Sequence, residues 1–297
     1  MKSTSWLHYF WKIPLCGLCF FLGFIPGAQL ATWMRLQTPA MPMGANQATV
    51  AQYTLLASLF LALGLAAVSH GLSGGFLSRW LILFFFTWVA YGVNTYLEAT
   101  IFSTMSTASL YAVVLFLPAS LLCSAAVAWF FPPDAPGAGF FAQARTFFAG
   151  RSVGSWTWRL SAGFLAFPLA YLVFGSLIAP IVMPYYQQGA DQLRLPGWDQ
   201  ILPVLALRSL LFLLVCLPII ISWQLSSRGL FLAMGLALFI LVGGIGMLEA
   251  YWLVPVLRVT HTLEIFADEM VYAAALTLLL ARPMTQPMGK PIFVSVQ

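Results

Sequence analysis

Eight long apolar segments constrain the fold of this chain more than any other feature of its sequence. Each segment has about 20 residues or more, the length an α-helix needs to cross the hydrocarbon core of a bilayer. The sequence therefore predicts an all-α, polytopic membrane helical bundle with about eight transmembrane helices and the lipid bilayer as its immediate partner. The expected spans cover residues 12–34, 50–72, 80–102, 107–131, 158–184, 201–224, 229–254 and 256–281.

The composition excludes a water-soluble protein. The chain is 61% hydrophobic and only 7% charged, whereas soluble domains carry about 25% charged residues. It therefore lacks the polar side chains needed to cover a surface that faces water. The net charge of +5 comes from basic residues scattered through short connections. Because they form no basic cluster, no nucleic-acid partner is expected.

The basic residues also predict how the helices are oriented. Lysine and arginine concentrate in the cytoplasmic connections of membrane proteins. An orientation with both termini in the cytoplasm, in a multi-pass protein of the cell membrane, places most basic residues on that side. The cytoplasmic set would be Lys2, Lys12, Arg79, Arg145, Arg151, Arg159, Arg228, Arg282 and Lys290, and the external set Arg35, Arg194 and Arg258.

Residues 132–157 form the longest internal connection and divide the spans into two groups of four. Residues 1–131 are expected to form the first four-helix unit, and 158–297 the second unit with a short cytoplasmic tail. The connection itself is interpreted as a cytoplasmic interfacial linker, because its apolar residues recur at helical spacing and suit a short helix on the membrane surface. These residues are Phe140, Phe141, Ala144, Phe147 and Phe148.

Matching motifs in the two groups suggest an internal duplication. Leu97-Glu98-Ala99 ends the third span and Leu248-Glu249-Ala250 ends the seventh. Trp11-Lys12 opens the first span, as Trp158-Arg159 opens the fifth. Units with an even number of spans have the same orientation in the membrane. The hypothesis is therefore two parallel four-helix repeats, related by an axis along the membrane normal.

The last span carries an unusual set of ionisable residues. At 100° per residue, His261, Glu264, Asp268 and Tyr272 share a stripe about 80° wide, while Arg258 borders it and Glu269 points elsewhere. An acidic residue at the centre of a membrane helix costs about 2.5–3.5 kcal/mol. The stripe is therefore expected to face the interior of the bundle or a water-filled cavity.

Other ionisable residues are expected at a similar depth. Glu98 and Glu249 end their spans on the external side, and Arg208 lies about two turns into the sixth span from that side. Burial disfavours the charged form of an unpaired carboxyl group, so Asp268 is also a candidate proton carrier. The candidate substrate- or proton-binding set is Glu98, Arg208, Glu249, Arg258, His261, Glu264 and Asp268. The alternative is that Arg208 and Arg258 form purely structural ion pairs with the glutamates.

Three classes of function fit this pattern. The favoured hypothesis is a transporter or permease for a small solute or ion, with an outward-facing polar pocket. The second is a membrane-embedded, metal-dependent enzyme in which His261 and Glu264 bind a metal ion and Glu98 and Glu249 complete its ligands. The third is a non-catalytic subunit or scaffold that binds a membrane-protein partner or a second copy of the chain. The sequence contains no protease, hydrolase or nucleotide-binding motif in a plausible setting, and it indicates no cofactor.

Overall fold

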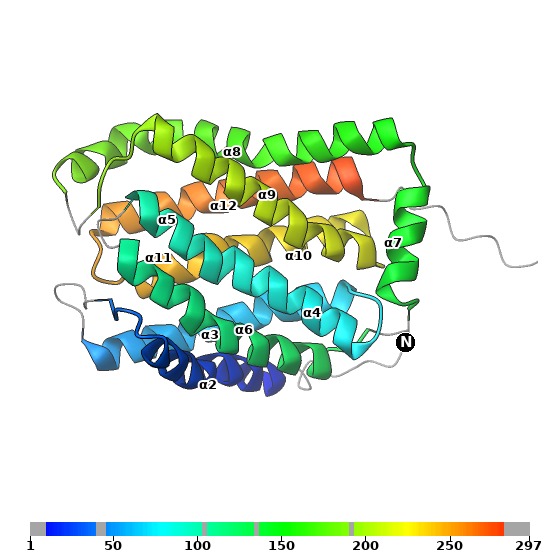
Figure 1. The fold of residues 1–297 in the computed structure, drawn as a ribbon, viewed down its shortest axis with the longest axis horizontal. Helices are drawn as coiled ribbons and strands as arrows, with labels where there is room; N and C mark the ends of the chain where they lie inside the picture. The colour runs from blue at the N-terminus through cyan, green and yellow to red at the C-terminus, as the bar shows by residue number, and fades with distance from the viewer. Residues whose placement is uncertain (1–9, 40–45, 103–105, 134–136, 190–192, 282–297) are drawn as a thin grey trace, which may run out of the picture.

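The computed structural model describes residues 10–39, 46–102, 106–133, 137–189 and 193–281, with the backbone alone for 106–109. Three of the basic residues used to predict the orientation, Lys2, Arg282 and Lys290, lie outside the described residues, as do linker residues 134–136. The prediction of an all-α fold is confirmed, because the described residues form helices and no strand. Figure 1 shows most of the helices running side by side along the long axis of the molecule.

The helices follow the predicted spans closely. The elements before residue 132 are α2 (Lys12–Trp33), α3 (Gln47–Gly71), α4 (Phe76–Thr87), the π-helical segment η1 (Trp88–Val93), α5 (Asn94–Phe102) and α6 (Ser106–Phe130). The short helix α7 (Phe140–Ala149) follows them. The remaining elements are α8 (Val153–Gln187), α9 (Trp198–Ser222), α10 (Ser227–Phe239), the π-helical segment η3 (Ile240–Gly244), α11 (Ile245–Glu249) and α12 (Pro255–Leu280).

Seven helices in the described part of the chain are long and apolar enough to cross a membrane. They are α2, α3, the run from α4 to α5, α6, α8, α9 and the run from α10 to α11. The helix α12 has 26 residues and lies among them, but it carries Arg258, Glu264, Asp268 and Glu269. Its length suffices to span the bilayer. A helix with this many charged residues is stable in a membrane, however, only if its charged side chains are turned away from lipid.

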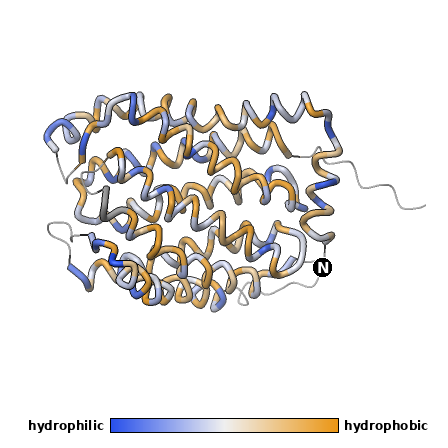
Figure 2. Tube along the Cα trace, in the orientation of Figure 1, coloured by the Kyte–Doolittle hydropathy of each residue, from blue (hydrophilic) through white to orange (hydrophobic). Residues whose placement is uncertain are grey.

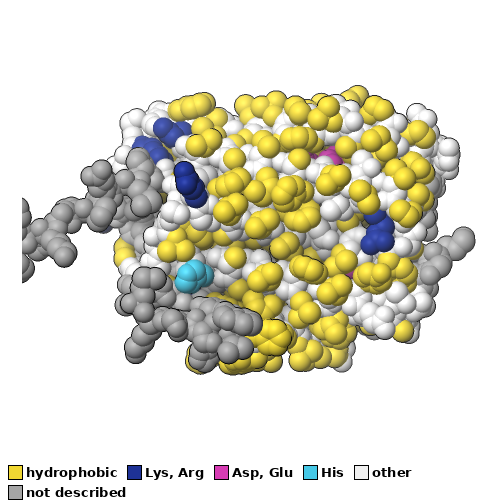
Figure 3. All heavy atoms as spheres, turned by 180° about the vertical axis from the view of Figure 1, so that it is seen from behind, with side chains coloured by type: hydrophobic (Ala, Val, Ile, Leu, Met, Phe, Trp, Pro, Cys, Tyr) yellow, Lys and Arg dark blue, Asp and Glu magenta, His cyan; other side chains and the backbone are white. Residues whose placement is uncertain are grey.

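The outer surface is mainly apolar. Hydrophobic side chains cover most of the face seen in Figure 3, and the few basic side chains on it lie toward the two ends. Along the chain, hydrophilic residues lie mostly near the helix ends (Figure 2). Large side chains such as Leu177 and Leu278 are exposed on this surface. A surface of this kind suits contact with lipid tails rather than water.

Small residues bring α2 and α6 into close contact. A Cβ atom added at Gly23 would lie 2.3 Å from the Ala119 Cα atom, and one added at Gly27 would lie 2.3 Å from the Leu115 carbonyl oxygen. Side chains larger than hydrogen would therefore force these helices apart. Close packing at small residues is a common way for helices to associate in membranes.

Basic side chains cap the carbonyl ends of α6 and α12. Lys12 donates a hydrogen bond to the Phe130 carbonyl oxygen at 3.1 Å, and Arg159 donates to the Leu279 carbonyl oxygen. The buried Arg79 donates to the carbonyl oxygens of Ala128, at 2.6 Å, and Phe131, at 2.9 Å. These cations satisfy carbonyls that have no partner within their own helix and match the negative end of the helix dipole.

An isolated antiparallel bridge joins the turn after α3 to the turn after α9. Leu72 pairs with Trp223. The Ser73 amide donates to the Ser222 carbonyl oxygen at 2.9 Å, and the Gln224 amide donates to the Gly71 carbonyl oxygen at 3.0 Å. The two turns are thus held together by backbone hydrogen bonds at the end of the bundle where α7 lies.

The third and seventh spans share a local irregularity. In each, a π-helical segment, η1 or η3, interrupts the α-helix shortly before the terminal glutamate, Glu98 or Glu249. π-Helical turns are rare and often occur at functional sites. Sequence periodicity predicted neither of them.

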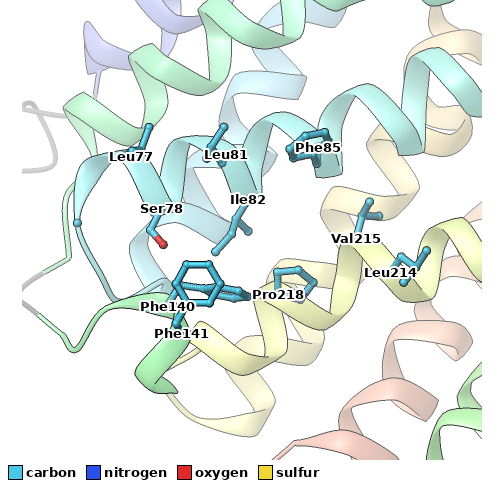
Figure 4. A pocket seen from close by; sticks show the side chains of 11 residues that line it. Leu77, Ser78, Leu81, Ile82, Phe85, Phe140, Phe141, Leu214, Val215 and Pro218 are labelled. Atoms are coloured by element: carbon cyan, nitrogen blue, oxygen red, sulfur yellow. The ribbon is translucent and has the colours of Figure 1, made fainter. Parts of the chain in front are cut away.

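An apolar groove lies between α4 and α9. It has a volume of about 730 Å³ and is closed at one end by Phe140 and Phe141 of α7. Figure 4 shows these two rings next to Ile82 and Pro218. Apart from the Ser78 hydroxyl group, the lining side chains are apolar. The groove contains no ionisable group, so the candidate site lies elsewhere.

Candidate functional site

A second cavity, of about 580 Å³, contains most of the ionisable residues singled out from the sequence. It lies in the half of the bundle away from α7. Side chains from α5, η1, α8, α9, η3 and α12 line it, together with the loop before α9. Five residues of the predicted set meet here: Glu98, Arg208, His261, Glu264 and Asp268.

Arg208 of α9 is the central cation of the cavity. Its side chain is only 3% exposed and lies 2.5 Å from a carboxylate oxygen of Glu98 on α5. Its Nε atom donates to the Asn94 amide oxygen at 2.8 Å. Its guanidinium also lies over the rings of Phe167 and Tyr171, 5.2 Å and 5.5 Å from their centroids. A buried arginine requires such a set of partners, because an unpaired charge inside a membrane is costly.

Pro168 helps to position Arg208. A proline inside a helix donates no backbone hydrogen bond to the carbonyl one turn earlier, which in α8 is the carbonyl of Phe164. The hydroxyl group of Ser209 on α9 donates to that carbonyl. The contact joins α8 to α9 one residue from Arg208. The proline in the fifth span thus contributes to the site indirectly.

His261 and Glu264 form a second polar pair on α12. The His261 Nδ1 atom lies 2.7 Å from a Glu264 carboxylate oxygen, one helical turn away. The other ring nitrogen, Nε2, lies 3.2 Å from the Tyr186 hydroxyl group of α8. These contacts orient the imidazole ring across the gap between α12 and α8. Because Tyr186 follows Pro184 near the end of α8, sequence periodicity did not identify it as a site residue.

Asp268 and Glu269 lie deeper in the cavity and lack partners. Asp268 is 3% exposed and Glu269 is fully buried. Neither the Asp268 Oδ1 atom nor either carboxyl oxygen of Glu269 has a hydrogen-bond partner among the described residues. The prediction that Glu269 points away from the site is wrong, because Glu269 also lines the cavity. The reason is that α12 packs against α8, α10 and η3, so more of its circumference faces the bundle interior than one stripe.

The loop before α9 covers one side of the cavity and is tied to α5. The Arg194 side chain donates to the carbonyl oxygens of Ile101, at 2.8 Å, and Thr100, at 2.5 Å. Its backbone amide donates to the Phe102 carbonyl oxygen at 2.9 Å. Arg194 thereby caps the end of α5. These contacts place Leu193, Leu195 and Pro196 against the cavity.

Glu249 and Arg258, which were also predicted to belong to the site, are not among the residues that line the cavity. The Tyr91 hydroxyl group donates to a Glu249 carboxylate oxygen at 3.0 Å. Arg258 donates to the Met247 carbonyl oxygen at 3.1 Å. Its partners are backbone carbonyls at the end of α11, so it stabilises the turn between α11 and α12.

Replacing Tyr91 with phenylalanine tests this separation of roles. The variant keeps the ring in the cavity wall but removes one of the two hydroxyl donors of the Glu249 carboxylate and leaves the other, Thr54. We expect the free energy of unfolding in mixed detergent micelles to fall by about 1.5–3 kcal/mol, the contribution of a hydrogen bond to a charged group. Solute binding in the cavity should be unchanged. A loss of binding without a loss of stability would instead place the Tyr91 hydroxyl group, or Glu249 through it, in the site.

Comparisons with protein-family models, curated proteins and solved structures find no match. The function is therefore inferred from the side chains of this chain alone.

The described residues offer no complete ligand set for the metal-site alternative. In the part of the chain that the structure describes, no group of three or more histidine, cysteine, aspartate and glutamate side chains is placed to hold a metal ion. His261 and Glu264 are hydrogen-bonded to each other, and Glu249 lies apart from them. Protein metal sites usually combine three or more such ligands.

Proposed function

We propose that the protein is a transporter or permease for a small solute or ion, which binds in the cavity between α5, α8, α9 and α12. The observation that supports this most strongly is the position of Arg208, Glu264 and Asp268. Each is less than a tenth exposed, and each lines the same hollow inside a bundle of apolar helices. Ionisable residues inside a membrane domain most often mark a substrate or ion pathway.

The broken helices beside the cavity support the same proposal. The π-helical segment η1 contributes Tyr91 to the wall and η3 contributes Val242 and Gly243. Transporters commonly build their substrate sites beside interrupted membrane helices. A scaffold subunit would have no need for a polar cavity there.

We also propose that the two four-helix units are parallel repeats. Glu98 and Glu249 stand in matching motifs of the two units, and the interval between them along the chain equals the interval between Leu72 and Trp223. Leu72 and Trp223 are therefore equivalent positions of the two units. Their pairing in the bridge is what two units related by a two-fold axis require. The π-helical segments and the basic caps on α6 and α12 occur at corresponding positions of the two units.

The proposed orientation places α7 in the cytoplasm and the cavity toward the outside. Basic residues near the α7 end include Lys12, Arg79, Arg145, Arg159 and Arg228, whereas most acidic residues lie in the other half. This asymmetry favours a cytoplasmic α7 end. Glu98 is 34% exposed at the other end, which suits a cavity that a solute reaches from outside.

Transport is tested with the full chain reconstituted in liposomes. A panel of small solutes is first screened for those that raise the melting temperature of the protein in nanodiscs, since ligands that bind the folded state stabilise it. Hits are then labelled and assayed for counterflow into liposomes preloaded with the same solute. Counterflow of a stabilising solute, above that of protein-free liposomes, is the expected result. Stabilising solutes that never cross the membrane would contradict the transporter proposal.

A further inference from the structure

The charges around the cavity do not balance. Four carboxyl groups line it: Glu98, Glu264, Asp268 and Glu269. The Arg208 guanidinium is already paired with Glu98 at 2.5 Å, and the His261 ring is already bonded to Glu264 at 2.7 Å. Among the described residues, Asp268 and Glu269 thus have no cation in direct contact, and the Arg208 guanidinium that acts on both of them is shared with Glu98. The cavity thus has more acidic than basic side chains, and a bound cation would reduce this excess.

Asp268 is the carboxyl group best placed to meet a ligand. It is 3% exposed, it lines the cavity, and its Oδ1 atom has no partner among the described residues. An isolated buried carboxylate is strongly unfavourable, whereas one paired with a cation at close range is not. A cationic ligand would supply the missing partner.

Glu269 differs from Asp268 in its surroundings. It is fully buried, and the charged or titratable groups that interact with it are Asp268 and Tyr272 on α12, Arg208 and Cys216 on α9, and Glu98 on α5. Because Glu269, unlike Asp268, has no exposed surface that a ligand could reach, and because Arg208 is engaged by Glu98, Glu269 is best accommodated as the neutral acid. The ligand charge is therefore assigned to Asp268.

The rest of the cavity wall suits an organic ion. Tyr171, Tyr186, Phe102 and Trp198 present aromatic rings, and apolar side chains fill the space between them. A volume of about 580 Å³ falls in the range of pockets that enclose small organic ligands, about 300–1,000 Å³. A bare metal cation would instead need a compact shell of several oxygen atoms.

We propose that the cavity binds a small organic cation, an alkylammonium or arylalkylammonium ion, with the Asp268 carboxylate as its counter-ion and the aromatic side chains around its apolar body. This proposal names the solute class for the transporter function proposed above.

Binding is tested by calorimetry on the full chain in nanodiscs. The probes are butylammonium, tetramethylammonium and 2-phenylethylammonium ions. The matched neutral and anionic probes are 2-phenylethanol and 3-phenylpropanoate. We expect at least one ammonium probe to bind at least about tenfold more tightly than either matched probe, a difference of about 1.4 kcal/mol. Binding of none of the three, or a preference for the propanoate, would overturn the proposal.

The Asp268→Asn variant tests the counter-ion. It keeps the shape of the side chain and removes a buried charge, so its melting temperature should not fall. The affinity for the ammonium probe should drop at least about tenfold. The control is Asp199→Asn, which removes an exposed charge from the first turn of α9, and its affinity should equal that of the unmodified protein. Equal affinities for all three proteins would overturn the assignment to Asp268.

Counterflow separates this inference from the transporter proposal. An ammonium ion that binds through Asp268 but is not transported would support the inference and contradict transport. A transported solute that is neutral or anionic, and insensitive to Asp268→Asn, would support transport and overturn the inference.

Discussion

Replacing Arg208 with methionine is expected to destabilise the protein by about 3 kcal/mol or more. The variant removes the cation from a buried pair and leaves Glu98 and the Asn94 amide oxygen without their donor. It also removes the cation–π contacts to Phe167 and Tyr171. Glu98 is partly exposed and can recover some hydration, which keeps the expected cost near the lower end of the range for buried pairs. The free energy of unfolding in mixed detergent micelles measures the effect.

Arg258→Met is the matched control for this variant. Arg258 is also partly buried, but its described partners are carbonyl oxygens of Met247 and Leu248, so we expect a loss of only about 1 kcal/mol. The double variant Arg208→Met with Glu98→Gln should recover part of the loss, because the uncompensated carboxylate is gone. Equal effects of the two arginine substitutions would contradict the role assigned to the Arg208–Glu98 pair.

Replacing Gly175 with phenylalanine is expected to block the cavity. A Cβ atom added at Gly175 would lie 3.4 Å from a Glu264 carboxyl oxygen, in ordinary contact, so the backbone accepts a side chain there. The phenylalanine ring would then extend into the space in front of Glu264. We expect counterflow of a transported solute to fall at least about tenfold, with little change in melting temperature.

The control is Gly154→Phe, near the start of the same helix. A Cβ atom added at Gly154 meets no other atom within 4 Å, and the residue does not line the cavity. Its counterflow should match that of the unmodified protein. Normal counterflow in the Gly175→Phe variant would show that the solute does not pass through this cavity.

Sequence periodicity predicted the helices well, because long apolar runs in a membrane chain permit little other than a helix. The expected span 12–34 is observed as Lys12–Trp33, and 256–281 as Pro255–Leu280. The largest differences, of five residues, occur at two helix ends. The helix α8 begins at Val153 rather than residue 158, and the seventh span ends at Glu249 rather than residue 254.

The structure brings five of the seven predicted site residues together around one cavity. His261, Glu264 and Asp268 share the cavity because the cost of exposing them to lipid forces α12 to turn this face inward. The contact between Arg208 and Glu98 followed from their similar depth in the membrane. A helical wheel, however, considers one helix alone. It could not show that α12 is enclosed on several sides, which is why Glu269 was misplaced.

Other site residues gave no signal in the sequence. Asn94 and Tyr171 surround Arg208 only because α5 and α8 converge on α9, and this depends on tertiary packing. The π-helical segments are equally invisible to periodicity, since a single inserted residue does not disturb an apolar run. Glu249 resembles Glu98 in its motif, but its partners are the Tyr91 and Thr54 side chains rather than an arginine.

The central claim is that the acidic face of α12 borders a water-accessible cavity. It is tested most directly by cysteine labelling in a background where Cys16, Cys19, Cys123 and Cys216 are replaced by alanine. Ala179→Cys and Leu177→Cys lie two residues apart on α8, but residue 179 lines the cavity and residue 177 is 67% exposed on the outer apolar surface. A membrane-impermeant, charged thiosulfonate is added from the side opposite α7. Rapid labelling at 179 and none at 177 is the predicted result, and the reverse pattern, or none at either position, would contradict it.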